Sequence, residues 1–161
     1  MDKDKQETLF KKYPTIFRDI GKPMNETAMY WGIQFGNGWE GLLDETCSKI
    51  TQIEKITGIK TVANTLKEKY GIARFYTDIY TEDARYINKE RMSDEDIELW
   101  IEIIDIMISE FEWRTAYVCE MCGKPGELRQ TGWVLTLCQE CLKKKTWEQS
   151  INCLKLKSEM N

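Results

Sequence analysis

Two pairs of cysteines near the C-terminal end have the spacing of metal ligands. Cys119 and Cys122 form one CxxC pair, Cys138 and Cys141 form a second, and fifteen residues separate the pairs. Two intervening residues let the chain fold back, so that both sulfurs of a pair reach one tetrahedral ion at about 2.3 Å. The four cysteines are therefore predicted to hold one structural Zn²⁺ per chain. An iron–sulfur cluster or a redox pair is the alternative.

The sequence contains six cysteines and no histidine. Without imidazole there is no Ser-His-Asp or Cys-His nucleophile pair, no HExxH metalloprotease and no Cys2His2 finger. Sulfur alone must then hold the zinc, and four thiolates leave no coordination position for water, so the metal is expected to support the fold. No catalytic residue is assigned. Of the two remaining cysteines, Cys47 is expected in the core and Cys153 in the last helix.

A glycine-rich segment is a candidate anion site. The residues from Gly36 to Gly41 formally match GxGxxG, but no acidic residue stands about twenty positions further on, and the chain is too short for a doubly wound sheet plus a ribbon. The candidate is the turn Gly36-Asn37-Gly38-Trp39, because the free backbone N–H groups of the helix that follows suit an anion. The alternative is a simple helix-entry turn.

A second candidate site combines basic and aromatic residues: Lys67, Lys69, Arg74 and Tyr76. Such a platform suits a phosphate or a nucleobase. On a pair of strands the same side chains would equally well form an exposed face that backs onto the core. Both interpretations stay open.

Apolar spacing, capping residues and a proline predict three helices in the body of the protein. These helices must position the candidate site residues. The first covers 3–13 and stops at a proline. The second covers 39–57, where apolar residues recur at helical spacing, and Gly58 is a natural C-cap. The third begins after the capping residue Ser93 and runs to about Arg114, with an apolar stripe on one side and carboxylates on the other.

Strands are expected at 59–62 and 73–80, where β-branched and aromatic residues are dense. The residues at 67–71 resemble a turn between two segments, although 63–70 also contains good helix formers. An aromatic stretch at 30–35 is either a strand or an irregular packed segment. In the ribbon, 127–130 and 133–137 are expected to pair as two short strands.

These elements predict an α+β fold with two parts. A mixed body of helices and short strands covers 1–117, and the zinc ribbon with a closing helix covers 118–161. The closing helix carries several lysines between 143 and 157, around a modest apolar stripe. It is expected to pack on the body, with a nucleic-acid or membrane-surface role as the alternative.

The charge is unevenly distributed along the 161 residues. The formal net charge is −4, yet 82–112 contains eleven acidic and three basic residues. This stretch is either a solvated helix face or an anionic surface for a basic partner. The first ten residues lack the apolar core of a secretory signal, and carboxylates interrupt the most apolar stretch at 97–111. The expected location is therefore the cytoplasm, with no membrane contact.

Short blocks spread over nearly the whole chain carry a family resemblance. They are Lys12-Tyr13-Pro14 with Ile16-Phe17, Trp31-Gly32, Gly36-Asn37-Gly38-Trp39, Lys67-Glu68-Lys69-Tyr70-Gly71 with Arg74-Phe75-Tyr76, and Cys119-Glu120-Met121-Cys122 with Trp133 and Thr136-Leu137-Cys138. In combination they resemble a family of small bacteriophage and prophage proteins. That family typically has an acid where Asn37 stands and varies at the position of Cys141. The resemblance implies a viral accessory protein in the host bacterial cytoplasm, and no established reaction.

The cysteine motif, the candidate sites and the resemblance are compatible with three functions. The leading hypothesis is a non-enzymatic phage accessory protein that inhibits a host antiviral system by sequestering a host protein or a small nucleotide ligand. The alternative is a nucleic-acid-binding zinc-ribbon factor that uses the lysines of the closing helix. A divalent-metal phosphodiesterase that relies on carboxylates is third.

Overall fold

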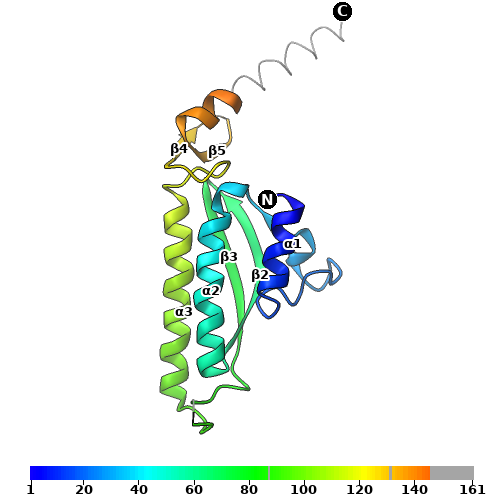
Figure 1. Cartoon of the computed structure of the whole chain (residues 1–161), viewed down its shortest axis with the longest axis vertical. Coiled ribbons are helices and arrows are strands. Elements are labelled where there is room, and N and C mark those ends of the chain that lie inside the picture. Colours follow the sequence, from blue (N-terminus) through cyan, green and yellow to red (C-terminus); the bar gives the residue numbers. More distant parts are fainter. Residues whose placement is uncertain (87, 131, 146–161) are drawn as a thin grey trace, which may run out of the picture.

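The computed structural model describes residues 1–86, 88–130 and 132–145 and has the α+β architecture expected from the sequence. Helices α2 (Glu40–Thr57) and α3 (Asp94–Thr115) lie side by side along a long hairpin of β2 (Lys60–Lys69) and β3 (Ile72–Tyr80) (Figure 1). Helix α1 (Lys3–Lys12) lies on the other side of α2 from α3, and Lys12 pairs with Asp44 of α2 at 2.6 Å.

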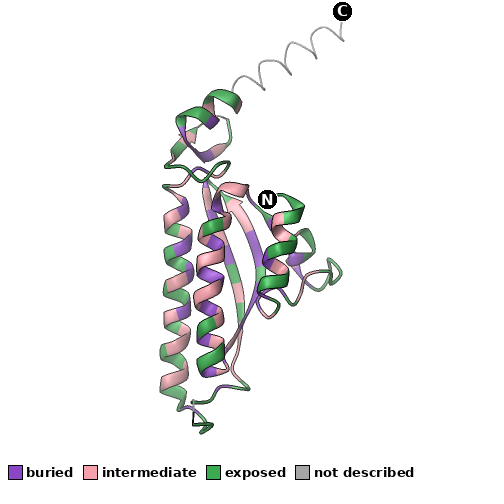
Figure 2. Ribbon diagram, viewed as in Figure 1, coloured by how far each residue is buried: buried purple, intermediate pink, exposed green. Residues whose placement is uncertain are grey.

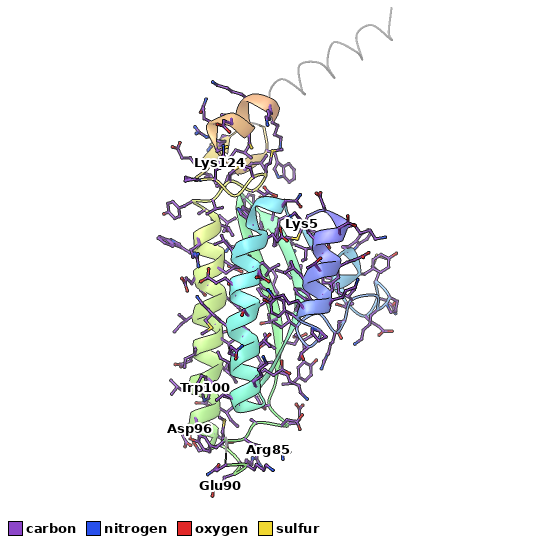
Figure 3. All side chains as sticks on the ribbon, in the orientation of Figure 1. Lys5, Arg85, Glu90, Asp96, Trp100 and Lys124 are labelled. Atoms are coloured by element: carbon purple, nitrogen blue, oxygen red, sulfur yellow. The ribbon has the colours of Figure 1, made fainter. Side chains whose placement is uncertain are left out.

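The remaining elements are short. Two 3-10 turns, η1 (Ala28–Trp31) and η2 (Asn37–Trp39), flank the two-residue strand β1 (Ile33–Gln34). The C-terminal part contains β4 (Glu127–Gln130) and β5 (Val134–Leu137), which pair antiparallel, followed by a helix that is described over 139–145. This part lies at one end of the elongated molecule, where Lys124 is labelled in Figure 3, and Asp96 lies near the opposite end.

The main sheet has the order β1-β2-β3. β1 runs parallel to β2 with Ile33 opposite Leu66, and β2 runs antiparallel to β3 with a bulge between Ala63 and Thr65. A two-residue turn of Tyr70 and Gly71 joins β2 to β3. This turn brings the tip of the hairpin to the C-terminal part of the chain, because the carbonyl oxygen of Gly71 accepts a hydrogen bond from Thr136 Oγ1 at 2.6 Å.

β2 is longer than the sequence indicates. A strand was expected only at 59–62 and a turn at 67–71, whereas β2 continues to Lys69 and the turn itself is two residues long. Pairing with β3 along the whole strand, together with burial of Thr65 and Leu66, outweighs the helix-forming residues in this stretch. The residues at 30–35 form η1 and β1, the irregular packed segment that was one of the two expected outcomes.

The expected ends of α2 and α3 are confirmed. Gly58 adopts the left-handed conformation with φ 75°, which ends α2, and its N–H donates to the carbonyl oxygen of Glu54. Ser93 Oγ accepts a hydrogen bond from the N–H of Asp96 at 3.1 Å, which caps the first turn of α3.

The core lies between the helices and the sheet, where buried residues line the inner faces (Figure 2). Trp39 is completely buried, and its ring packs on Phe35, with the two centroids 5.4 Å apart. The ring of Phe111 in α3 packs on those of Phe35 and of Phe75 in β3, with centroids 6.3 and 6.2 Å away. The segment that leads into α2 is therefore packed on the same aromatic cluster as α3 and the sheet.

Helix α3 covers the outer edge of the sheet with its side chains. The N–H of Ala73 donates to Thr115 Oγ1 at 2.9 Å, and the N–H of Phe75 donates to Glu112 Oε1 at 2.7 Å. Glu112 also pairs with Arg74 at 2.6 Å. Two backbone donors that an edge strand would leave unpaired are thereby satisfied. Among the described residues, no helix has the length and apolar character that a membrane crossing requires.

Candidate metal centre

The four CxxC cysteines come together at the end of the molecule. The sulfur atoms of Cys119, Cys122, Cys138 and Cys141 all lie within 4.8 Å of one another, and those of Cys122 and Cys138 are 3.6 Å apart. In a tetrahedral site with metal–sulfur bonds of about 2.3 Å, the sulfurs are separated by roughly 3.8 Å. The spacing of the donors therefore fits one metal ion held by four thiolates.

The first pair sits in a tight knuckle directly after α3. The N–H of Cys119 donates to the carbonyl oxygen of Lys124 at 2.8 Å, and the N–H of Gly123 donates back to that of Cys119 at 2.9 Å. Gly123 has φ 76°, a left-handed conformation that glycine adopts without a steric penalty. This knuckle folds the chain back before β4 begins.

The second pair lies where β5 passes into the helix at 139–145. Cys138 follows β5, and the N–H of Cys141 donates to Cys138 Sγ at 3.4 Å. This hydrogen bond is the largest cause that lowers the pKa of Cys138 to about 7, whereas burial raises the pKa of Cys141. Lys124 of the first knuckle pairs with Glu140 of the second at 2.8 Å, so an ion pair on the surface also links the two.

The glycine turn of the body packs directly against the first knuckle. The N–H of Gly38 donates to the carbonyl oxygen of Glu120 at 2.7 Å, and the N–H of Gly36 donates to Glu120 Oε1 at 3.0 Å. The indole N–H of Trp39 donates to the carbonyl oxygen of Val118 at 2.7 Å. Three donors of one short segment thus hold the residues on both sides of Cys119.

This geometry gives the Gly36–Trp39 turn a structural role. The sequence indicated this turn as a candidate anion site, but the N–H groups of Gly36 and Gly38 within it donate to Glu120. The side chain of Asn37 exchanges hydrogen bonds with Asp2, which ties the start of the chain to the same turn. Burial raises the pKa of Glu120, and the N–H of Gly36 partly offsets this effect. The turn is a connector between body and cysteine centre.

The members of the basic and aromatic platform lie on adjacent strands, with Lys67 opposite Arg74 in the β2–β3 register. Lys67 Nζ lies 5.8 Å from the centre of the Tyr76 ring. Arg74 is engaged by Glu112, as described above, which leaves Lys67, Lys69 and Tyr76 as the available members.

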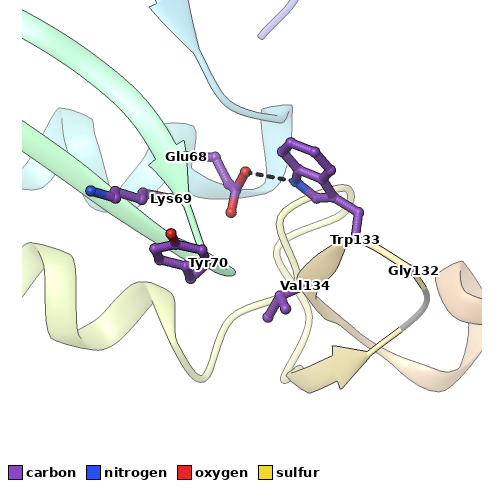
Figure 4. A pocket seen from close by; sticks show the side chains of 6 residues that line it. All are labelled: Glu68, Lys69, Tyr70, Gly132, Trp133 and Val134. Carbon is purple, nitrogen blue, oxygen red and sulfur yellow. Dashed lines mark hydrogen bonds between the residues drawn. The ribbon is translucent and has the colours of Figure 1, made fainter.

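A pocket lies next to this platform, at the tip of the β2–β3 hairpin. Its volume is about 330 Å³, and it is lined by Glu68, Lys69, Tyr70, Gly132, Trp133 and Val134 (Figure 4). The indole N–H of Trp133 donates to Glu68 Oε2 at 3.3 Å. Trp133 and Glu68 were not among the candidate site residues. Both residues stand in the blocks that carry the family resemblance, which is the signal in the sequence that points to them.

The two remaining cysteines differ in what the structure shows. Cys47 is buried in α2, as expected, and burial raises the pKa of its thiol, so it is an unreactive part of the core. Cys153 and most of the segment that the sequence predicts as a lysine-rich closing helix lie outside the described residues.

The fold and the site define an α+β protein with a four-cysteine centre docked onto its body through a glycine turn. No protein-family model, no curated protein and no solved structure matches the chain.

Proposed function

We propose that this chain is a non-enzymatic binding protein that a structural Zn²⁺ ion holds together. Four thiolates around one ion are the preferred donors of structural zinc, and they leave no open position for a substrate or water. In keeping with the phage and prophage proteins that it resembles, it would inhibit a host antiviral system by sequestering a host protein. One surface supports this proposal: the outer face of α3.

The outer face of α3 exposes large apolar side chains in a row. Leu99, Ile106 and Trp113 are 55%, 66% and 65% exposed, and they follow one another at intervals of seven residues. Tyr117 extends the row just beyond the helix, where its ring packs on Trp113 with centroids 4.9 Å apart. Residues seven apart lie on the same side of a helix, so the row runs along one face of α3, with about 10 Å between successive members.

Carboxylates flank this apolar row: Glu95, Glu98, Glu102, Asp105 and Glu110. All five are exposed. Glu110 lies 3.7 Å from Arg114, whereas the other four form no ion pair with any described residue. We call the row and its flanking carboxylates the acidic–apolar face.

The chemistry of the acidic–apolar face selects one kind of partner. A helix with an apolar stripe between lysines or arginines would bury the row and neutralise the carboxylates together. A second copy of the chain, docked face to face, would instead bring unpaired carboxylates of like charge close to one another. The face therefore favours a basic amphipathic segment of a different protein.

The test is a quantitative comparison of surface variants. The full chain is used to capture partners from a lysate of the bacterial host, and the captured protein is purified and titrated against the wild type and Leu99→Ser/Ile106→Ser. We expect the double variant to bind at least about ten-fold more weakly, because truncating central apolar contacts of an interface typically costs about 2 kcal/mol or more.

Met24→Ser is the matched control, since Met24 is equally exposed, at 61%, but lies outside α3. It should bind as the wild type does. A second arm, Glu98→Lys/Glu102→Lys, should weaken binding most at low salt, where charge attraction is least screened. Unchanged affinity in both α3 variants would rule out the acidic–apolar face as the binding surface.

A further inference from the structure

The pocket at the hairpin tip is a second surface, separate from the acidic–apolar face and independent of the function proposed for it. It lies between the Tyr70-Gly71 turn, which joins β2 to β3, and the residues Gly132 and Trp133, which precede β5. Two of its lining side chains are large aromatics that face solvent, since Tyr70 is 71% exposed and Trp133 is 68% exposed. Figure 4 shows these two rings on opposite sides of Glu68.

Tyr70 adopts a backbone conformation that its side chain disfavours. Its φ is 55° and that of Gly71 is 80°, so both residues of the turn are left-handed. Two-residue hairpin turns of this kind strongly prefer asparagine, aspartate or glycine at the first position, and a bulky residue there is strained. Burial does not compensate for this strain, because the ring is mostly exposed. Strain at an exposed aromatic residue points to a role in binding.

Hydrogen bonds hold both aromatic residues on a rigid support. Glu68 Oε1 accepts from the N–H of Gly71 at 2.5 Å, and Glu68 Oε2 accepts from the indole N–H of Trp133. The hydroxyl of Thr136 in β5 donates to the carbonyl oxygen of Gly71. One carboxylate thus orients the tyrosine turn and the tryptophan ring together, so little conformational freedom remains to be lost when a ligand binds.

The charged groups at the rim narrow the class of ligand. Lys69 lines the pocket, and its Nζ lies 5.6 Å from the centre of the Tyr70 ring. Two exposed rings suit a flat heterocycle, and the ammonium group of Lys69 beside Tyr70 suits an anion. A cationic ligand would meet the ammonium group of Lys69, which already lies over the Tyr70 ring.

We propose that this pocket binds a nucleotide, with the base stacked against Trp133 and Tyr70 and the phosphate near Lys69. A volume of about 330 Å³ lies at the small end of the range for ligand pockets, so the site would take one base. The base is that of a free nucleotide or of one unit in a single strand. Both present the same stacking surface and phosphate.

Isothermal titration calorimetry on the full zinc-loaded chain tests this proposal. The probes are AMP, GMP, CMP and UMP, a single-stranded oligonucleotide of eight thymidines, and ribose 5-phosphate as a ligand without a base. At least one base-containing probe should bind, and ribose 5-phosphate should bind far more weakly. Binding of a mononucleotide assigns the free ligand as the source, whereas binding of the oligonucleotide alone assigns a strand.

Two pocket variants separate binding from folding. Trp133→Ala and Tyr70→Asn should each weaken the bound probe by about 5- to 150-fold, the loss expected for one base–aromatic stack. Tyr70→Asn should at the same time raise the melting temperature, because asparagine tolerates the left-handed conformation. If Tyr70 had only a structural role, its replacement would not combine weaker binding with a higher melting temperature. Trp113→Ala, which removes an equally exposed tryptophan from α3, should leave the affinity unchanged.

The proposal is overturned if none of the base-containing probes binds at millimolar concentration. Equal binding of ribose 5-phosphate, or unchanged affinity in both pocket variants, would overturn it as well. Because Trp133→Ala and Tyr70→Asn leave α3 intact, a failure here would not affect the acidic–apolar face.

Discussion

At the scale of single residues, two glycines decide how closely the body approaches the cysteine centre. A methyl group on Gly38 would overlap the carbonyl oxygen of Cys119 and the amide nitrogen of Gly123, both of which are backbone atoms. A methyl group on Gly36 would overlap the carbonyl oxygen of Glu120. Backbone in a tight knuckle cannot move aside cheaply, so only glycine permits this contact.

Gly38→Ala should therefore destabilise the protein by about 1–3 kcal/mol, the usual cost of overpacking. It should also weaken metal retention against a chelator, because the displaced knuckle carries two of the ligands. Urea unfolding measures the first effect, and metal release to a colorimetric chelator measures the second.

Gly41→Ala is the matched control for this substitution. Gly41 lies in the first turn of α2, with nothing within 4 Å of an added methyl group. Replacing a helical glycine with alanine should stabilise the protein by about 0.5–1 kcal/mol. Equal effects at Gly38 and Gly41 would contradict the account of the close approach.

These residues also show where sequence reasoning stops. The four ligands follow from local CxxC spacing, because each pair is fixed by two intervening residues. The role of Gly36 and Gly38 does not, since the carboxylate and carbonyl that occupy their N–H groups belong to Glu120, more than eighty positions away. A glycine-rich turn before a helix looks the same whether its donors face solvent or another part of the chain.

At the scale of elements, the two sides of α3 differ in what they contact. Its inner side supplies Phe111 to the core and Glu112 and Thr115 to the edge of β3. Its outer side carries the acidic–apolar face. The buried stripe could be predicted from the 3.6-residue period. The outer apolar row could not be distinguished from core in advance, because an apolar residue in a helix does not reveal what covers it.

Glu112→Ala should cost about 1–3 kcal/mol of unfolding free energy, because the N–H of Phe75 and the guanidinium of Arg74 both lose their partner. Chemical denaturation monitored by circular dichroism measures this loss. Glu102→Ala on the same helix, where the carboxylate is exposed and unpaired among the described residues, should change stability by less than about 0.5 kcal/mol. A similar small change at both positions would contradict the edge contact.

At the scale of the whole molecule, the cysteine centre and the body are one structural unit. The turn at Gly36–Trp39 and the hairpin tip at Gly71 each bond to the C-terminal part, at residues next to the ligands and in β5. Several hydrogen bonds thus cross the boundary at 117 that the sequence indicated, between the hydrophobic core on one side and the four-cysteine cluster on the other.

Elemental analysis should find one zinc per chain, and Cys119→Ser should lose it together with part of the thermal stability, because a buried ligand is removed. Cys47→Ala removes a buried thiol outside the centre and should keep the zinc. A wild-type preparation without zinc would contradict the assignment of the ion.

Removal of the metal by a chelator should also change hydrogen exchange in the body. Once the knuckle is released, the amides of Gly36 and Gly38 should exchange hydrogen faster, since their acceptors belong to Glu120. Amides in the middle of α2, such as that of Ile50, should keep their protection, because their hydrogen bonds lie within the helix. Unchanged exchange at the two glycines would show that the contact does not depend on the metal.

The capped sheet edges limit the ways in which this protein can recognise another one. Side chains occupy the outward N–H groups of Ala73 and Phe75 on one edge, and Gln6 Oε1 accepts from the N–H of Ile33 in the opposite edge strand at 2.8 Å. At these positions no foreign strand can add to the sheet, whether from a partner or from a second misfolded copy. Side chains on helices and turns are free of this restriction, and a few substitutions there can change the target without disturbing the sheet.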